Sequence, residues 1–206
     1  MALLDWTCRQ LSDHLDGQVR MHIRLRIPMF LGGLFFLLLM ACAVVRAQAP
    51  EQERQVKAAY LYKFAGFVDW PDGSFERPDS PLLIGVAGDT ALAEQLELSV
   101  AGHSVNGRVV QVKKVRRGEP LAGLHVLYLG GLDKALAQEM LVASRGLALL
   151  TVSDSDEVHA MGSMINFVMA RDRMRFDVAL KPVAQAHIRI SARMLLAAYR
   201  VQTEGA

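Results

Sequence analysis

The chain has 206 residues, of which 52% are hydrophobic and 21% are charged, and its formal net charge at pH 7 is +2. Residues 1–47 hold five arginines and three acidic residues, and subtracting them from the totals of 23 basic and 21 acidic residues leaves 18 of each. The remaining 159 residues are enough for one domain with a hydrophobic core, and their neutral charge excludes nucleic acid as the expected partner.

An apolar run of 19 residues, Ile27 to Val45, lies between Arg26 and Arg46. It follows a basic segment and leads into a small-residue pattern that ends at Ala47, a combination typical of a secretory signal peptide. We therefore predict that residues 1–47 are a signal peptide with an extended basic region, and that cleavage separates Ala47 from Gln48.

Three features of this N-terminus stay open. Translation from Met21 would give a basic region of ordinary length. The apolar run also reaches the lower end of the length that spans a membrane, roughly 17–25 residues, so an uncleaved inner-membrane anchor is an alternative. Finally, Leu39 to Cys42 resembles a lipoprotein box, and a lipid on Cys42 would tether the domain to a membrane.

Both cysteines, Cys8 and Cys42, belong to this leader. The domain after residue 47 therefore has no disulfide, no thiol nucleophile and no cysteine ligand for a metal. We expect its stability to come from the hydrophobic core.

Pro50 and Glu51 favour the start of a helix, because proline is tolerated in the first turn and an acidic side chain suits the positive end of the helix dipole. We expect this helix to end by Trp70, since the residue before a proline avoids helical geometry. Its predicted core face consists of apolar residues at helical spacing: Val56, Tyr60, Phe64 and Phe67. Lys57 and Lys63 fall off that line.

Strands and helices alternate after this helix. Three apolar runs predict strands buried on both faces of a sheet, over residues 82–87, 125–129 and 147–152. Helices are predicted over residues 91–100 and 132–144. Asn106-Gly107 predicts a tight turn in a hairpin over residues 104–110.

The C-terminal part begins with a second predicted hairpin, in which residues 165–169 and 174–178 alternate in polarity. A last helix is predicted to begin after Ser191 and to continue through Val201. The whole order predicts an α/β fold for residues 48–206: a single domain with a mixed β-sheet, flanking helices, and a C-terminal β-hairpin followed by a helix.

Catalytic motifs are missing from the sequence. It has no Gly-x-Ser-x-Gly, no His-Glu-x-x-His and no phosphate-binding loop with its lysine. The histidines are too scattered to bind a metal from one element, so we expect no enzyme activity, no metal and no cofactor. Asp154, Asp156 and Glu157 follow a strand, where α/β sheets often bind ligands, although a solvated loop is the simpler interpretation.

Alternating residues near the C-terminus suggest a surface for a partner or a small anion. In an extended segment, His187 and Arg189 share the outer face while Ile188 and Ile190 point inward. Arg175 and Asp177 alternate in the same way on the strand before it. An ordinary solvated edge is the alternative interpretation of these four polar residues.

Motifs spread over the domain resemble the YfiR family of periplasmic proteins. They run in order from residue 54 to about residue 201, and the combination is more specific than any single motif. The matching stretches are VKAAYLYKF (56–64), VDWP (68–71), IGVAGD (84–89), VLYL (126–129), LLTVSD (149–154), GSMINFV (162–168), MRFDV (174–178) and ISARMLL (190–196).

The resemblance implies a regulator rather than an enzyme. Members of this family repress inner-membrane diguanylate cyclases by binding the periplasmic sensor domain, which lowers cyclic di-GMP signalling and biofilm formation. Some members are sequestered in turn by an outer-membrane lipoprotein. The implied location is the periplasm, and a homodimer is left open. The alternative function is a periplasmic small-molecule binding module that feeds a different receptor.

Overall fold

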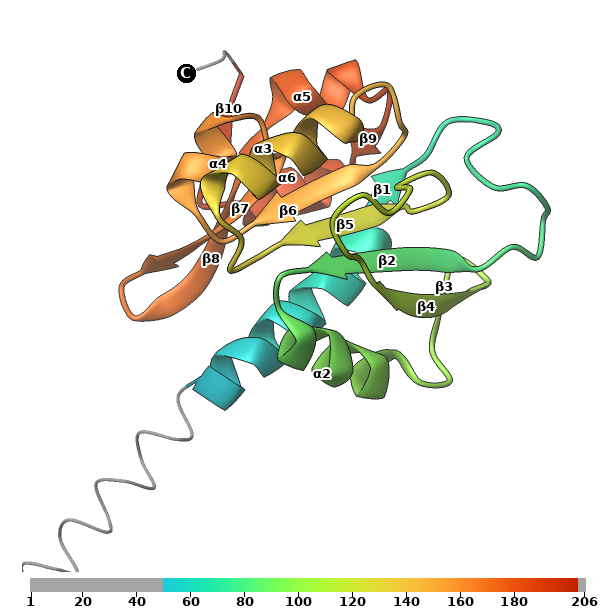
Figure 1. Cartoon of the computed structure of the whole chain (residues 1–206), viewed down its shortest axis with the longest axis horizontal. Helices are drawn as coiled ribbons and strands as arrows, with labels where there is room; N and C mark the ends of the chain where they lie inside the picture. The colour runs from blue at the N-terminus through green and yellow to red at the C-terminus, as the bar shows by residue number, and fades with distance from the viewer. Residues whose placement is uncertain (1–49, 204–206) are drawn as a thin grey trace, which may run out of the picture. The chain divides into compact units, whose positions relative to one another are not determined.

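The computed structural model describes residues 50–203 (Figure 1). The predicted signal peptide, its cleavage site between Ala47 and Gln48, and the lipidation candidate Cys42 lie outside the described residues. None of the helices in the described range is long and apolar enough to cross a membrane.

The described chain begins within a helix that spans residues 50–65, here called the N-terminal helix. The other helices are α2 (Thr90–Val100), α3 (Lys134–Ala143), α4 (Asp156–Ala160), α5 (Leu180–Gln185) and α6 (Ala192–Ala197). The strands are β1 (Val68–Asp69), β2 (Leu82–Ala87), β3 (Ser104–Val105), β4 (Arg108–Lys114), β5 (Val126–Leu129), β6 (Leu150–Ser153), β7 (Ile165–Ala170), β8 (Arg173–Ala179), β9 (Arg189–Ile190) and β10 (Arg200–Gln202).

Eight of these strands form one mixed sheet in the order β10-β8-β7-β6-β5-β2-β4-β3. In this order, the five strands from β7 to β4 run parallel to one another. The pairs β7–β8 and β3–β4 are antiparallel and form the two predicted hairpins. Asn106 and Gly107 both have positive φ, as the predicted tight turn requires. The predicted α/β fold with a mixed sheet and flanking helices is confirmed.

Helices cover both faces of this sheet (Figure 1). The N-terminal helix, α2, α5 and α6 pack on one face, and α3 and α4 pack on the other. Side chains alternate between the two cores along β5, where Val126 and Tyr128 join the first core and Leu127 and Leu129 join the second. This double burial explains why the central strands are apolar throughout.

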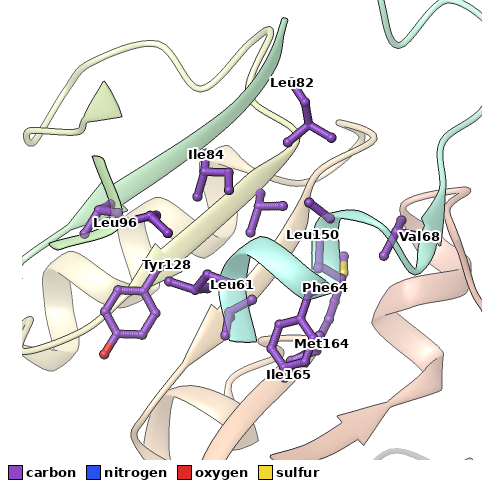
Figure 2. Close-up of a cluster of buried hydrophobic side chains, with 14 of the residues drawn as sticks. Leu61, Phe64, Val68, Leu82, Ile84, Leu96, Tyr128, Leu150, Met164 and Ile165 are labelled. Carbon is purple, nitrogen blue, oxygen red and sulfur yellow. The ribbon is translucent and has the colours of Figure 1, made fainter. Parts of the chain in front are cut away.

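The N-terminal helix contributes buried side chains to the larger core. Figure 2 shows Leu61 and Phe64 beside Ile84, Leu150 and Ile165 of the sheet. The ring of Phe64 lies 5.8 Å from that of Phe167 and 4.9 Å from that of Phe176. These aromatic contacts join the helix to the β7–β8 hairpin.

The predicted core face of this helix is partly wrong. Val56 and Phe67 are both 36% exposed, whereas Lys57, which was placed off the core line, is 7% exposed. The helix also ends at residue 65, and Val68–Asp69 forms β1, which pairs with β9 in a separate two-stranded sheet. The buried face is therefore rotated toward Lys57 and Leu61, and the chain leaves the helix one turn earlier than the apolar pattern suggests.

The prediction that the last helix continues through Val201 is wrong. Helix α6 ends at Ala197, and residues 200–202 add strand β10 to the outer edge of β8. Tyr199 donates its backbone N–H to the carbonyl of Phe176 at 2.8 Å. The free edge of β8 offers backbone partners that a solvent-exposed last helical turn would lack, so the segment pairs as a strand.

His125 attaches the loop after β1 to the sheet. Its Nδ1 accepts a hydrogen bond from the N–H of Leu83 at 3.1 Å, so its Nε2 carries the proton and donates to the carbonyl of Ser74 at 3.1 Å. The ring of Phe75 stacks on the imidazole, with ring centroids 4.1 Å apart. The guanidinium carbon of Arg108 lies 3.7 Å from the centroid of the Phe75 ring. Both hydrogen bonds together require a neutral His125.

This requirement predicts a pH dependence of stability. Burial lowers the pKa of His125 below its ordinary value of 6.5, and the nearby charge of Arg108 lowers it further, against a smaller opposing effect of the Ser74 hydrogen bond. The pKa of His125 is lower in the folded state than in the unfolded state. The stabilisation that comes from neutral His125 should therefore be complete above about pH 6.5, and it should be lost as the pH falls through the folded-state pKa.

Urea unfolding between pH 7.5 and 5 would measure this slope for the wild type and for His125→Gln. We expect the stability of the variant to change less with pH than that of the wild type. Some pH dependence should remain, because burial also lowers the pKa of His159. Equal slopes would show that the His125 hydrogen bonds do not depend on its protonation state.

Candidate functional site

A cavity of about 370 Å³ opens at the carboxyl ends of β6 and β7. Its wall combines charged groups with apolar side chains from the β7–β8 hairpin. The lining residues are Glu53, Lys57, Asp154, Asp156, Phe167, Val168, Met169, Met174 and Arg200.

The crevice where parallel α/β sheets more often bind ligands is closed here. Helices on opposite faces follow β2 and β5, which makes the junction of these strands the topological switch point. A Cβ on Gly88 would lie 1.9 Å from the carbonyl oxygen of Gly130, so the two backbones already touch. Asp89 and Asp133, which follow the two strands, cap α2 and α3. The cavity next to β6 is therefore the better candidate.

An ion pair lies at the inner wall of this cavity. Lys57 Nζ is 2.7 Å from Asp154 Oδ2 and 2.7 Å from Glu53 Oε1. The hydroxyl of the fully buried Tyr128 donates a second hydrogen bond to Asp154 Oδ2 at 2.7 Å. Asp154 therefore joins the N-terminal helix to β5 through the end of β6.

The protonation states at this wall follow from the contacts. Burial by itself lowers the pKa of Lys57, but the hydrogen bonds and negative charges of Asp154 and Glu53 outweigh burial and raise the pKa above its ordinary value. Burial first, and then the charge of Asp154, raise the pKa of Tyr128. Lys57 therefore stays a cation and Tyr128 stays neutral, so neither serves as a nucleophile or a base at neutral pH.

Polar residues continue from the cavity across the sheet. Ser153, Asn166, Asp177 and Arg200 are register partners on β6, β7, β8 and β10. Ser153 donates to Asn166 Oδ1 at 3.0 Å, and Arg200 Nε lies 3.5 Å from Asp177 Oδ2. Asn166 donates in turn to Asp156 Oδ1 at 2.8 Å. The row crosses four strands on the face covered by α4.

A serine and a histidine meet in this row without forming a catalytic pair. Ser163 lies 3.4 Å from His159 Nδ1, but Ser163 is fully buried. The His159 Nε2 atom has no hydrogen-bond partner, so no carboxylate orients the ring. Burial lowers the pKa of His159, against smaller opposing effects from Ser163, Asp177 and Asp156. These residues form a structural network.

The structure separates the four residues of the predicted partner surface. Arg175 and Asp177 lie on β8 of the large sheet, whereas Arg189 lies on β9 of the two-stranded sheet. Asp177 is 4% exposed and sits beneath Arg200, so it is not available for contact. His187 and Arg189 are exposed and Ile188 is buried, as the alternation predicts. The predicted surface is therefore two separate areas, one at Arg175 and one at Arg189.

Sequence reasoning missed Lys57 as the partner of Asp154. The two residues are 97 positions apart, and only the packing of the N-terminal helix against the sheet brings them together. Asp156 and Glu157 also form the first turn of α4, capped by Ser155, where a solvated loop was the simpler interpretation. One signal was present in the sequence: Lys57 lies directly beside the apolar face of the helix, and a lysine that becomes buried there needs a charged partner.

A comparison with protein families identifies the chain. The model of a family described as YfiR/HmsC-like matches residues 54–198, which is most of the chain and nearly all of the described domain. The predicted resemblance is confirmed. The family is one of regulators rather than enzymes.

Removing the cation from the cavity wall should destabilise the fold. Lys57→Met would leave the carboxylates of Asp154 and Glu53 without their cation. Fully buried pairs lose about 3–5 kcal/mol in this way, and we expect about 2 kcal/mol because Asp154 is partly exposed. Lys63→Met, on the exposed side of the same helix, should change stability by less than about 0.5 kcal/mol. Urea unfolding measures both, and equal midpoints would mean that the ion pair does not stabilise the helix contact.

Proposed function

Because the chain belongs to the YfiR/HmsC-like family, we propose that it is a periplasmic repressor of an inner-membrane diguanylate cyclase. In this proposal it binds the periplasmic sensor region of the cyclase and lowers the production of cyclic di-GMP. The observation that carries the proposal is the family match over residues 54–198.

The chemistry of the domain supports a role in binding. Lys57 and Tyr128 both bind Asp154, and Ser163 is buried beside the half-buried His159 of α4. These contacts favour a role in which the domain binds a partner through its surface. Export by the predicted signal peptide would bring that surface to the periplasmic side of the cyclase.

Two further partners belong to the proposal. An outer-membrane lipoprotein could remove the repressor from the cyclase by competing for it, and a second copy of the chain could form a homodimer. The lipoprotein comes from the family resemblance, whereas the homodimer is an open possibility, and both would depend on surfaces of the described domain.

A second candidate function is a small-molecule binding module that feeds a different receptor. The observation in its favour is the cavity of about 370 Å³, which lies within the usual size range of ligand sites, roughly 300–1,000 Å³. Its wall combines a charged end at Lys57 and Asp154 with an apolar side at Phe167 and Met174. Such a wall suits a small molecule that has one polar end and one apolar end.

Deleting the gene tests the first function. Loss of a repressor should raise cyclic di-GMP and biofilm formation in a strain that expresses the cognate cyclase, and restoring the gene should lower both. Pull-down with the exported protein from solubilised membranes should capture that cyclase. Unchanged cyclic di-GMP together with no captured cyclase would reject the repressor and favour the binding module.

Two alanine variants test the two predicted areas of surface separately. Arg175→Ala and Arg189→Ala each remove one guanidinium, and truncation of an interface hot spot costs about 2 kcal/mol or more of binding free energy. We expect weaker binding to the cyclase with a nearly unchanged melting temperature. Binding that is lost together with the melting temperature would mean that the arginine is structural, and unchanged binding would remove that area from the interface.

A further inference from the structure

Strand β10 leaves one edge of the large sheet unpaired. It is the last strand in the order, and within residues 50–203 it pairs only with β8. An unpaired edge presents a row of backbone N–H and C=O groups that another extended segment can use. At the opposite edge, β3 has two residues and pairs with Arg108 and Val109 at the start of β4.

The two faces of the sheet differ in chemistry at this edge. Arg200 is the register partner of Asp177, so it shares a face with Asp177 and with Arg175 and Arg173, which lie two and four residues away on β8. Asp177 is the only acidic residue in this group, and it is already paired with Arg200. This face is therefore positively charged.

The other face at the same edge is apolar. Val201 is the register partner of Val178, whose side chain belongs to the large core, and Val201 itself is 39% exposed. Leu196, near the end of α6, is 87% exposed, and Tyr199 is 48% exposed. Exposed apolar side chains that gather beside an unpaired strand are a feature of binding surfaces.

Tyr199 joins the two faces. The guanidinium of Arg175 lies 6.0 Å from the centre of the Tyr199 ring, and that of Arg200 lies 5.3 Å from it. Arg175 also donates to the carbonyl of Ala197 at 3.4 Å, which holds its side chain beside the end of α6. Two cations are thus kept next to an exposed aromatic ring at the edge of the sheet.

We propose that β10 is a docking edge for an extended segment of a protein partner in which acidic and apolar residues alternate. A strand added beside β10 would place successive side chains on opposite faces. Its acidic residues would meet Arg175 and Arg200, and its apolar residues would meet Val201 and Leu196. The assignment of this segment to the sensor region of the cyclase rests on the proposed function.

A second copy of this chain fits the edge poorly. Pairing β10 with β10 of another molecule would bring Arg200 and Arg175 of both copies close together, and like charges on adjacent strands destabilise the pair. Charge complementarity therefore favours a different protein with an acidic strand.

Two variants test the edge without disturbing the core. Leu196→Asp changes a side chain that is almost fully exposed, and Arg175→Glu reverses one cation of the basic face. Each should weaken binding to the solubilised cyclase about 30-fold, the change that corresponds to a hot spot of about 2 kcal/mol. The matched controls are Leu98→Asp on α2 and Arg116→Glu after β4, both exposed and distant from β10, and they should bind like the wild type.

Salt provides a second readout. Binding of the wild type should weaken as sodium chloride rises from about 50 to 300 mM, and the weakening should be smaller for Arg175→Glu, because screening acts on the charge pairs that this variant removes. Equal binding by Leu196→Asp, Arg175→Glu and both controls would overturn the docking edge.

A synthetic peptide separates this inference from the proposed function. A peptide of alternating glutamate and valine should bind the exported wild-type protein and not the two edge variants, and a matched peptide of lysine and valine should not bind. Peptide binding without capture of a cyclase would support the edge and reject the repressor. Capture of the cyclase by all variants without peptide binding would support the repressor and reject the docking edge. Loss of a dimer in Leu196→Asp, with cyclase binding intact, would assign the edge to a second copy and overturn the proposal.

Discussion

The contact between the N-terminal helix and the sheet is the interaction on which the rest of the structure depends. Leu61 and Phe64 fill the larger core, and Lys57 forms an ion pair with Asp154 at the end of β6. The apolar part of this contact supplies most of the driving force, while the ion pair sets the position of the helix along the sheet, since a lysine this deeply buried needs its carboxylate partners. Without the helix, solvent would reach one face of β5 and β6. It would also reach the hydroxyl of Tyr128.

The polar groups at the carboxyl ends of the strands are mostly bonded to one another. Parallel α/β sheets commonly keep the carboxyl ends of their strands open for ligands. In this chain the switch point is closed by the contact of Gly88 with Gly130, and the polar groups at β6 and β7 satisfy one another. Lys57 and Tyr128 are held in their cationic and neutral forms. The hydrogen bonds and the ion pair among these groups help to stabilise and specify the fold.

The C-terminal strand β10 is an edge strand of the large sheet, and within residues 50–203 no strand pairs with its outer side. Natural proteins usually shorten or charge their edge strands to prevent unwanted pairing, and β10 is both short and basic. The same arginines that discourage pairing with a neutral or basic strand would select an acidic one. Exposed Leu196, Tyr199 and Val201 add apolar area beside the arginines, so the edge combines selectivity with a source of binding free energy.

The sequence by itself determined the α/β class, the buried central strands, both hairpins and the family, because these features depend on local periodicity, turn residues and continuous motifs. His125, Lys57 and the last strand show what it left undecided. The acceptor role of His125 Nδ1 depends on the N–H of Leu83, and the burial of Lys57 depends on Asp154, a residue 97 positions away. Residues 198–201 have apolar spacing compatible with a helix, and the free edge of β8 pairs with residues 200–202 as strand β10. Tertiary structure decided these points because each one depends on a partner that is distant in sequence. Local sequence patterns do not predict which distant groups will come into contact.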